Sequence, residues 1–147
     1  MLHTDWITEK DIAYIEKLEQ ETFSDAWSYQ SLLETWMQPQ VMMLGVWADD
    51  VFAGYVILYY VLDEGEIARI AVSESMRRQG VGTVLFRDLV KICCDKGITK
   101  ILLDVRESNE TAIAFYQSHG FVQDGKRKNF YTTPSEDAIL MSLVVGR

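Results

Sequence analysis

The run Val51–Val61 constrains the fold of this chain more than any other segment. It is apolar almost throughout and rich in aromatic residues, with a single glycine, Gly54, inside it. A strand of this composition needs cover on both of its faces. The run is also well short of the ~20 apolar residues that cross a bilayer. We therefore expect an internal strand of a sheet that lies between layers of helix.

The segments around this run predict further strands and two preceding helices. Val41–Ala48 and Glu66–Val72 have strand-like patterns, and Asp49-Asp50 is a plausible hairpin turn. Helical spacing of apolar residues predicts a first helix over about Glu9–Thr22, opened by a capping box of Thr8 and Asp11. Residues 23–27 form a loop, after which Ser28 caps a second helix that runs to about Met37 and stops before Pro39.

The second half of the chain alternates helices and strands. We expect a basic loop at 74–79, then a helix from Gly80 to Gly97 and a strand Lys100–Arg106. A short helix Glu110–Ser118 follows. The last two strands are Phe121–Val122 and Ala138–Val145, joined across a polar segment that contains Pro134. This order predicts one mixed α/β (α+β) sheet with helices on its faces. The length fits a single domain over residues 1–147.

Composition excludes several classes of protein. The formal net charge of −8 makes nucleic acid an unfavourable direct partner. A cationic partner is one interpretation of this charge, and simple solubility is the other. The N-terminus lacks the basic and apolar blocks of a signal peptide, so a cytoplasmic location is expected, with no membrane partner. The only cysteines, Cys93 and Cys94, are adjacent and match no disulfide or zinc pattern, so we expect no metal.

The strongest motif is Arg77-Arg78-Gln79-Gly80-Val81-Gly82, between a strand and a long helix. Consecutive main-chain amides at a helix N-terminus converge on a point, and the helix dipole adds positive charge there. Two glycines allow an anion to approach without meeting a Cβ. The spacing matches neither the dinucleotide fingerprint nor the P-loop. A phosphate or pyrophosphate site and a plain turn both remain open from this motif alone.

A second candidate site lies on the strand Lys100–Arg106 and the helix after it. Strand alternation puts Leu102, Asp104 and Arg106 on one face and Leu103 and Val105 on the other. Asp104 must therefore point to a cleft, a partner or water, or else hydrogen-bond the following turn. Tyr116, on the short helix, is by default a half-buried aromatic with its hydroxyl at the surface.

These residues resemble the GNAT family of N-acetyltransferases. Arg77-x-x-Gly80-x-Gly82 fits the acyl-CoA signature of that family, and the order of elements is similar throughout. The narrower resemblance is to the RimI group of bacterial ribosomal-protein-alanine N-acetyltransferases. It is carried by Ile70-Ala71-Val72, Arg78–Gly82, Asp104–Phe121, Glu136–Met141, Phe23…Trp27-Ser28 and Arg127-x-Asn129-Phe130-Tyr131. The resemblance implies a mixed sheet of about six to seven strands with about four flanking helices.

The resemblance also implies a role for each matched residue. The residues implied to bind acetyl-CoA, as a co-substrate, are Ile70, Ala71, Val72, Arg78, Gln79, Gly80, Val81, Gly82, Thr83 and Asn109. Tyr116 would be the general acid. The family's general base, a Glu, aligns with Asp104. Because the Asp104 side chain is one methylene shorter, it would need a bridging water to accept the proton, or it is not the base. Trp27 and Tyr131 lie in segments that border the acceptor groove of similar proteins.

The implied activity is acetyl-CoA-dependent acetylation of a protein N-terminus, by resemblance the N-terminal alanine of ribosomal small-subunit protein eighteen. One alternative is the same scaffold acting on a small amine or on other protein N-termini. Another is an acyl-CoA-binding module without catalysis, which the aspartate at the base position would suit. The sequence leaves the oligomeric state open, and a monomer is compatible with it.

Overall fold

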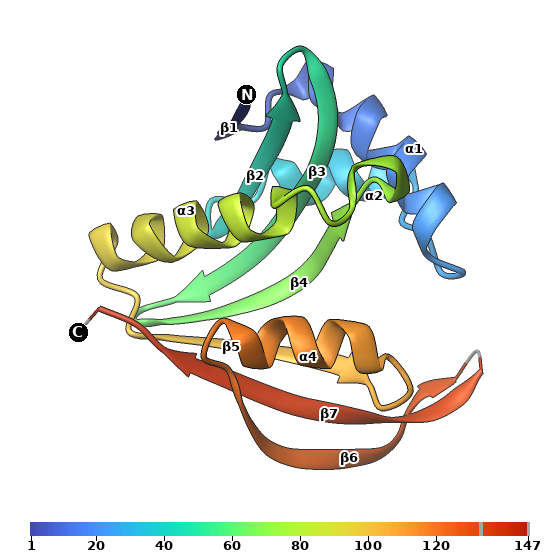
Figure 1. The fold of residues 1–147 in the computed structure, drawn as a ribbon, viewed down its shortest axis with the longest axis vertical. Coiled ribbons are helices and arrows are strands. Elements are labelled where there is room, and N and C mark those ends of the chain that lie inside the picture. Colours follow the sequence, from blue (N-terminus) through green and yellow to red (C-terminus); the bar gives the residue numbers. More distant parts are fainter. Residues whose placement is uncertain (133, 147) are drawn as a thin grey trace.

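Seven strands form one sheet with helices on both faces (Figure 1). The computed structural model describes residues 1–132 and 134–146. The strands are β1 (Leu2–Trp6), β2 (Val41–Ala48), β3 (Val51–Val61), β4 (Glu64–Val72), β5 (Lys100–Arg106), β6 (Val122–Thr132) and β7 (Ser135–Val144). The α-helices are α1 (Ile12–Thr22), α2 (Tyr29–Trp36), α3 (Val81–Asp95) and α4 (Glu110–Ser118).

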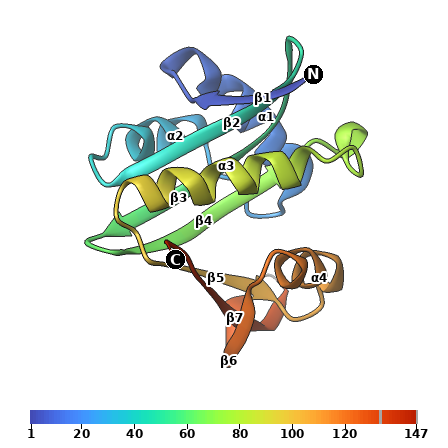
Figure 2. The same ribbon diagram turned by 60° about the vertical axis from the view of Figure 1, so that its left-hand side comes forward.

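The sheet has the order β1-β2-β3-β4-β5-β7-β6. Every neighbouring pair is antiparallel except β4 and β5, which are parallel and are connected through α3. That parallel pairing covers only Glu64–Glu66 against Lys100–Leu102. Beyond it the two strands diverge, and Figure 2 shows the sheet divided into two halves at this point.

Two apolar clusters hold the helices to the sheet. On one face α3 packs through Val81, Leu85 and Leu89 into a cluster that also includes Tyr116 of α4. On the opposite face α1 and α2 pack through Ile12, Ile15, Leu18 and Leu32. The middle of β3 is buried between these clusters, which confirms the double cover predicted for Val51–Val61.

The predicted caps explain where the helices begin. The main-chain amide of Thr8 donates to the Asp11 carboxylate over 2.9 Å, which confirms the capping box, although the first turn, Glu9–Asp11, is a 3-10 helix. Ser28 accepts from the Ser31 amide and caps α2. Asn109 caps α4 by accepting from the Ala112 amide over 3.2 Å.

At the edges of the sheet, one strand was missed and one prediction was wrong. The sequence analysis gave no element for β1, and the polar segment before Pro134 is the long strand β6 rather than a connection between short strands. Both are edge strands, and their side chains are mostly exposed, so neither has the apolar pattern that marks an internal strand. Position 133, within that segment, lies outside the described residues. β4 also begins two residues earlier than predicted, at Glu64.

Gly54 allows β3 and β4 to approach closely where β4 ends. A Cβ built on Gly54 would lie 2.6 Å from the carbonyl oxygen of Ala71 and 3.2 Å from the Cα of Val72. Both contacts are with backbone, so a side chain there would push the end of β4 away.

We predict that Gly54→Ala lowers the free energy of unfolding by about 1–3 kcal/mol, the usual cost of overpacking. Urea unfolding monitored by circular dichroism measures this change. Gly125→Ala is the matched control, because a Cβ on that strand glycine meets nothing within 4 Å. Equal stability of the two variants would contradict the prediction.

Candidate active site

The diverging edges of β4 and β5 form the centre of the candidate site. Among the described residues, the parallel pairing of β4 ends at Glu66, so the segment Ile70–Val72 has its β5-facing edge unpaired by that strand. Main-chain groups inside a fold need hydrogen-bond partners from side chains, water or a ligand, and the Val72 carbonyl accepts from Arg77 Nε over 3.3 Å. Ile70 and Val72 pack toward the face that carries α3, and Ala71 packs toward the face that carries α1.

The helix α3 begins beside this opening. Gly80, at φ +81°, is in the left-handed region and forms the N-cap of α3, and Arg78 is also left-handed at φ +66°. The Val84 amide donates to the Gly80 carbonyl over 3.0 Å. The amides of Val81, Gly82 and Thr83 precede this bond and so belong to the first helical turn, which has no intrahelical acceptors. This geometry suits an anion.

Gly82 has a packing role in addition to the contact with the co-substrate that stays a prediction for it. A Cβ on Gly82 would come within 3.2 Å of the Phe115 ring of α4. The missing side chain therefore lets the first turn of α3 pack closely against α4, in addition to leaving the amides open. At Gly80 a Cβ would meet nothing within 4 Å, so there the left-handed backbone is the reason for glycine.

Asp104 and Tyr116 lie toward opposite faces of the sheet. Ile101, Leu103 and Val105 of β5 are buried in the cluster that contains Tyr116, whereas Asp104 is exposed on the other face, as strand alternation predicted. The sequence predicted a half-buried Tyr116, but only 8% of its surface is exposed. Burial, with a smaller contribution from Tyr131, raises the pKa of the Tyr116 phenol, so this side chain keeps its proton.

Tyr131 of β6 lies against the Arg106 side chain of β5. Its ring lies under the Arg106 guanidinium, whose carbon is 4.3 Å from the ring centroid. Burial raises the pKa of Tyr131, and the negative charge of nearby Asp104 raises it further. Tyr131 is therefore within electrostatic range of both Asp104 and Tyr116, and its place beside the acceptor groove stays a prediction. A bulge in β6 between Arg127 and Tyr131, with Asn129 at φ +53°, turns the strand at this place.

Comparison with known proteins identifies the family. The model of the acetyltransferase (GNAT) family matches residues 11–121. The chain belongs to the acetyltransferase (GNAT) family. This membership confirms the resemblance on which the predicted fold was based.

The relatives of this GNAT protein include ribosomal-protein-alanine N-acetyltransferases. A putative [ribosomal protein bS18]-alanine N-acetyltransferase of Bacillus subtilis is 34% identical over 93% of this chain and 91% of its own length. The [ribosomal protein bS18]-alanine N-acetyltransferase of Salmonella typhimurium is 33% identical over 95% of each chain. The narrower resemblance to this group is thereby confirmed.

Solved structures confirm the predicted fold. The ribosomal-protein-S18-alanine N-acetyltransferase from Escherichia coli superposes with a TM-score of 0.92 and 30% identity, over 100% of this chain and 96% of that chain. Arabidopsis thaliana NAA60 in complex with acetyl-CoA shares the fold, with a TM-score of 0.90 and 15% identity over the whole of both chains.

The GNAT chain uses Asn109 as a helix cap. Its side-chain oxygen is bonded to the Ala112 amide, and the residue is exposed at the start of α4. A contact with the co-substrate stays a prediction for Asn109. The same holds for Arg78 and Gln79, which are exposed in the turn before α3, where the Gln79 amide nitrogen donates to the Ser75 carbonyl over 3.2 Å.

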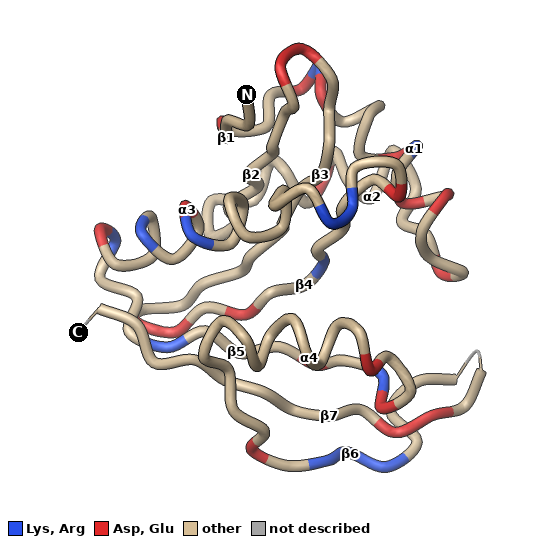
Figure 3. The backbone as a smooth tube through the Cα atoms, in the orientation of Figure 1, with Lys and Arg blue, Asp and Glu red and all other residues tan. Residues whose placement is uncertain are grey.

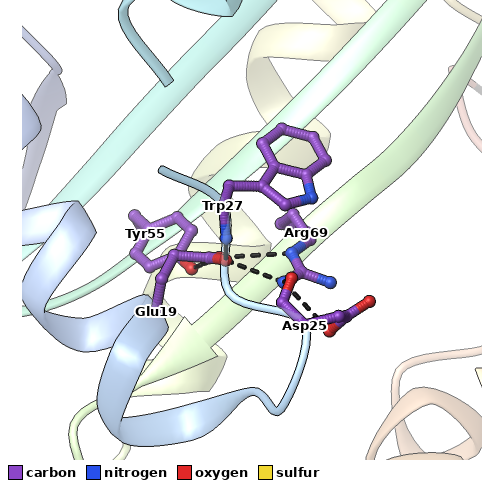
Figure 4. A network of polar contacts seen from close by, with 5 residues as sticks. All are labelled: Glu19, Asp25, Trp27, Tyr55 and Arg69. Carbon is purple, nitrogen blue, oxygen red and sulfur yellow. Dashed lines mark hydrogen bonds and ion pairs between the residues drawn. The ribbon is translucent and has the colours of Figure 1, made fainter. Parts of the chain in front are cut away.

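Sequence reasoning missed a charged network beneath the segment that carries Trp27. Glu19 of α1 is fully buried, and its carboxylate accepts from the Trp27 main-chain amide over 2.9 Å and from Arg69 over 2.7 Å (Figure 4). A charged residue inside a helix resembles an ordinary surface position, so the pattern of α1 alone gave no sign of it. Arg69, a lone arginine within an apolar strand, was the one signal available.

Metal and membrane elements are not found in the described part of the chain. Residues 1–132 and 134–146 contain no group of three His, Cys, Asp or Glu side chains that could hold a metal ion. No helix in the same residues combines the length and the apolar character needed to cross a bilayer.

The buried cysteine is unreactive. Burial raises the pKa of the Cys93 thiol to about 11, so this thiol is inert as a nucleophile.

We predict that Tyr116 weakens the fold at alkaline pH. Because its pKa is raised by folding, the unfolded state loses the phenolic proton first, and stability falls as the pH rises above about 10. Removing the hydroxyl in Tyr116→Phe should reduce that fall by up to about 1.4 kcal/mol per pH unit. Urea unfolding at several values between pH 9 and 11 measures it. The exposed Tyr14, changed to Phe, is the control, and identical slopes in the two variants would refute the assignment.

Proposed function

We propose that this chain is an acetyl-CoA-dependent Nα-acetyltransferase that acts on the N-terminal alanine of ribosomal protein bS18. The observation that carries the proposal is the opening between β4 and β5, with the open amides of α3 near one face and Asp104 on the other. Such an opening allows a thioester held from one face to meet an amine that arrives from the other. The identity of the acceptor is inferred from the Salmonella and Bacillus relatives, which are named for acetylation of the alanine of ribosomal protein bS18.

The residues present fit the chemical groups of acetyl-CoA. The amides of Val81, Gly82 and Thr83, with those of Arg78, Gln79 and Gly80 in the preceding turn, would bind the diphosphate. The open edge of Ile70–Val72 would hydrogen-bond the pantetheine arm as an additional strand does. Asn109, at the start of α4, would contact the molecule from the opposite side.

The acceptor must lose a proton before it reacts. A peptide α-ammonium group has a pKa near 7.7–8.0, so a modest base is sufficient near neutral pH. Asp104 is the carboxylate on the acceptor face, and it is exposed, so water can reach it. Because aspartate is shorter than the family's glutamate, we propose that Asp104 accepts this proton through a bridging water.

The leaving thiolate must gain a proton, and Tyr116 is suited to provide it. Its pKa is raised by burial, so the phenol remains protonated throughout the range in which the amine is a nucleophile. The amine attacks the thioester carbonyl directly, and a main-chain amide near Val72 would stabilise the oxyanion. No covalent intermediate on cysteine is needed: Cys93 is buried in the core, and Cys94 is exposed in the last turn of α3, at the end opposite the open amides.

Charge around the acceptor side supports a basic substrate. Asp25, Asp104 and Glu136 are all close enough to Tyr131 to raise its pKa, whereas Arg106 lowers it. Figure 3 shows acidic residues both in the loop after α1 and at the start of β7, on the side toward which β4 and β5 open. A protein N-terminus carrying further positive charge, as in a ribosomal protein, would be attracted to this side. Trp27 and Tyr131 would border the bound peptide.

We predict that Tyr116→Phe lowers kcat by about 10²–10⁴-fold, the usual contribution of general acid–base catalysis. Binding of acetyl-CoA, measured by calorimetry, should remain at the wild-type value because the diphosphate and pantetheine contacts are elsewhere. Tyr59→Phe, on the far part of β3, provides the matched control. Wild-type turnover in Tyr116→Phe would remove Tyr116 from the role of acid.

The acceptor class is tested with a panel of substrates. We expect the protein with acetyl-CoA to acetylate peptides that begin Ala-Arg, and to act poorly on peptides that begin with Met or that offer only a lysine side chain. Mass spectrometry would locate the acetyl group at the α-nitrogen. Equal activity on free polyamines would support a small-amine acetyltransferase instead, and binding of acetyl-CoA without transfer to any acceptor would support a non-catalytic module.

A further inference from the structure

The carboxylate of Glu19 is saturated with donors on every side. It accepts from the Trp27 amide, from Arg69 Nη2 over 2.7 Å and from Arg69 Nε over 3.2 Å, and it also accepts from the Tyr55 hydroxyl. No part of the residue is exposed to solvent. Glu19 therefore cannot exchange protons with a substrate, although it is an acid on the acceptor face of the sheet. Its contacts point to a positioning role.

Arg69 connects this buried carboxylate to the loop between α1 and α2. Its Nη2 donates to the Asp25 carbonyl over 3.2 Å and lies 3.4 Å from the Asp25 carboxylate (Figure 4). Its guanidinium carbon is 3.9 Å from the centre of the Phe23 ring and 5.3 Å from that of Trp27. The loop 23–27 is thus folded around one guanidinium. Burial opposes its charge, but Glu19, Asp25 and Tyr55 together outweigh burial, so the pKa of Arg69 is raised.

The position of Arg69 in β4 links the loop to the reaction site. The register between β3 and β4 shifts between Ile67 and Arg69, so a bulge at Ala68 precedes the arginine. The next three residues are Ile70–Val72, the open edge of β4. On the opposite side, the charge of Asp25 reaches Tyr131 of β6. Arg69 therefore joins the loop to the strand position directly before the edge that would hold the co-substrate.

We propose that Arg69, held by Glu19, is a positioning residue for the acceptor: it fixes the loop 23–27 as the wall against which the peptide N-terminus binds. This inference rests on the proposed function. It predicts that loss of the anchor weakens acceptor binding and leaves co-substrate binding intact, because the open amides of α3 are not attached to the loop.

Hydrogen–deuterium exchange tests the anchor without any assay of activity. In Arg69→Lys the flat guanidinium and its paired donors are lost while the charge is kept. We expect the amides of residues 23–28 to exchange at least about tenfold faster than in the wild type. Tyr55→Phe is the matched control, because Tyr55 contacts the same carboxylate from the sheet, and within the described residues it makes no hydrogen bond to the loop. Its loop amides should exchange at the wild-type rate.

Kinetics then test what the anchor does. For Arg69→Lys we expect KM for an Ala-Arg peptide to rise about tenfold or more, with the Kd for acetyl-CoA within about twofold of wild type. Tyr55→Phe should lower the Tm yet leave the peptide KM unchanged. Glu19→Gln, which keeps the shape of the carboxylate and removes its charge, should reproduce the Arg69→Lys pattern, and it carries the test if Arg69→Lys does not fold.

Two results would overturn the inference. One is a peptide KM that stays at the wild-type value in both anchor variants, and the other is an equal rise in KM and loop exchange in Tyr55→Phe, which would indicate a loss of stability only. Failure of the proposed function is separate: the wild-type protein would acetylate no peptide, while the exchange of residues 23–28 would still report on the anchor.

Discussion

The early end of the pairing between β4 and β5 is the constraint on which the rest of this structure depends. Two parallel strands that pair only over Glu64–Glu66 and Lys100–Leu102 leave main-chain groups of both strands open in the middle of a sheet. Open groups at that depth are costly unless a polar ligand or water meets them. In the proposed function an extended, amide-bearing molecule would meet these groups, and its anionic part would lie at the first turn of α3 beside them.

This opening also separates the two halves of the proposed reaction. Alternation along β5 directs Asp104 to the face of α1 and α2 and directs its neighbours Leu103 and Val105 to the face of α4. Tyr116 is buried on the face of α4, where its pKa is raised, and Asp104 is exposed on the other face. The proposed proton acceptor and the proposed proton donor would thus work from different surroundings on one reacting centre.

The acceptor side is built from segments that are distant in the chain. The loop 23–27 precedes β2, whereas Tyr131 belongs to β6 near the C-terminus, and the charges of Asp25 and Asp104 both act on Tyr131. The loop is held by Arg69 and Glu19 and by the packing of Phe23 and Trp27 against the core, whereas the bulge of β6 is held by Asp137, whose carboxylate accepts from the Asn129 amide over 2.9 Å. Specificity can then change through these two segments while the sheet and the α3 turn remain the same.

Local patterns in the sequence determined most of the elements of this protein. The bounds of β2, β3, β5 and α4 follow from apolar runs and from caps such as Asn109, because these signals act within a few residues. The turn at Gly80 and the placement of Asp104 on its strand face are also local. Tertiary structure alone decided the edge strands β1 and β6, whose backbones pair without an apolar pattern, and the burial of Glu19. A carboxylate enters a core only where donors from other segments meet it, and no pattern within α1 specifies Trp27, Tyr55 and Arg69 as those donors.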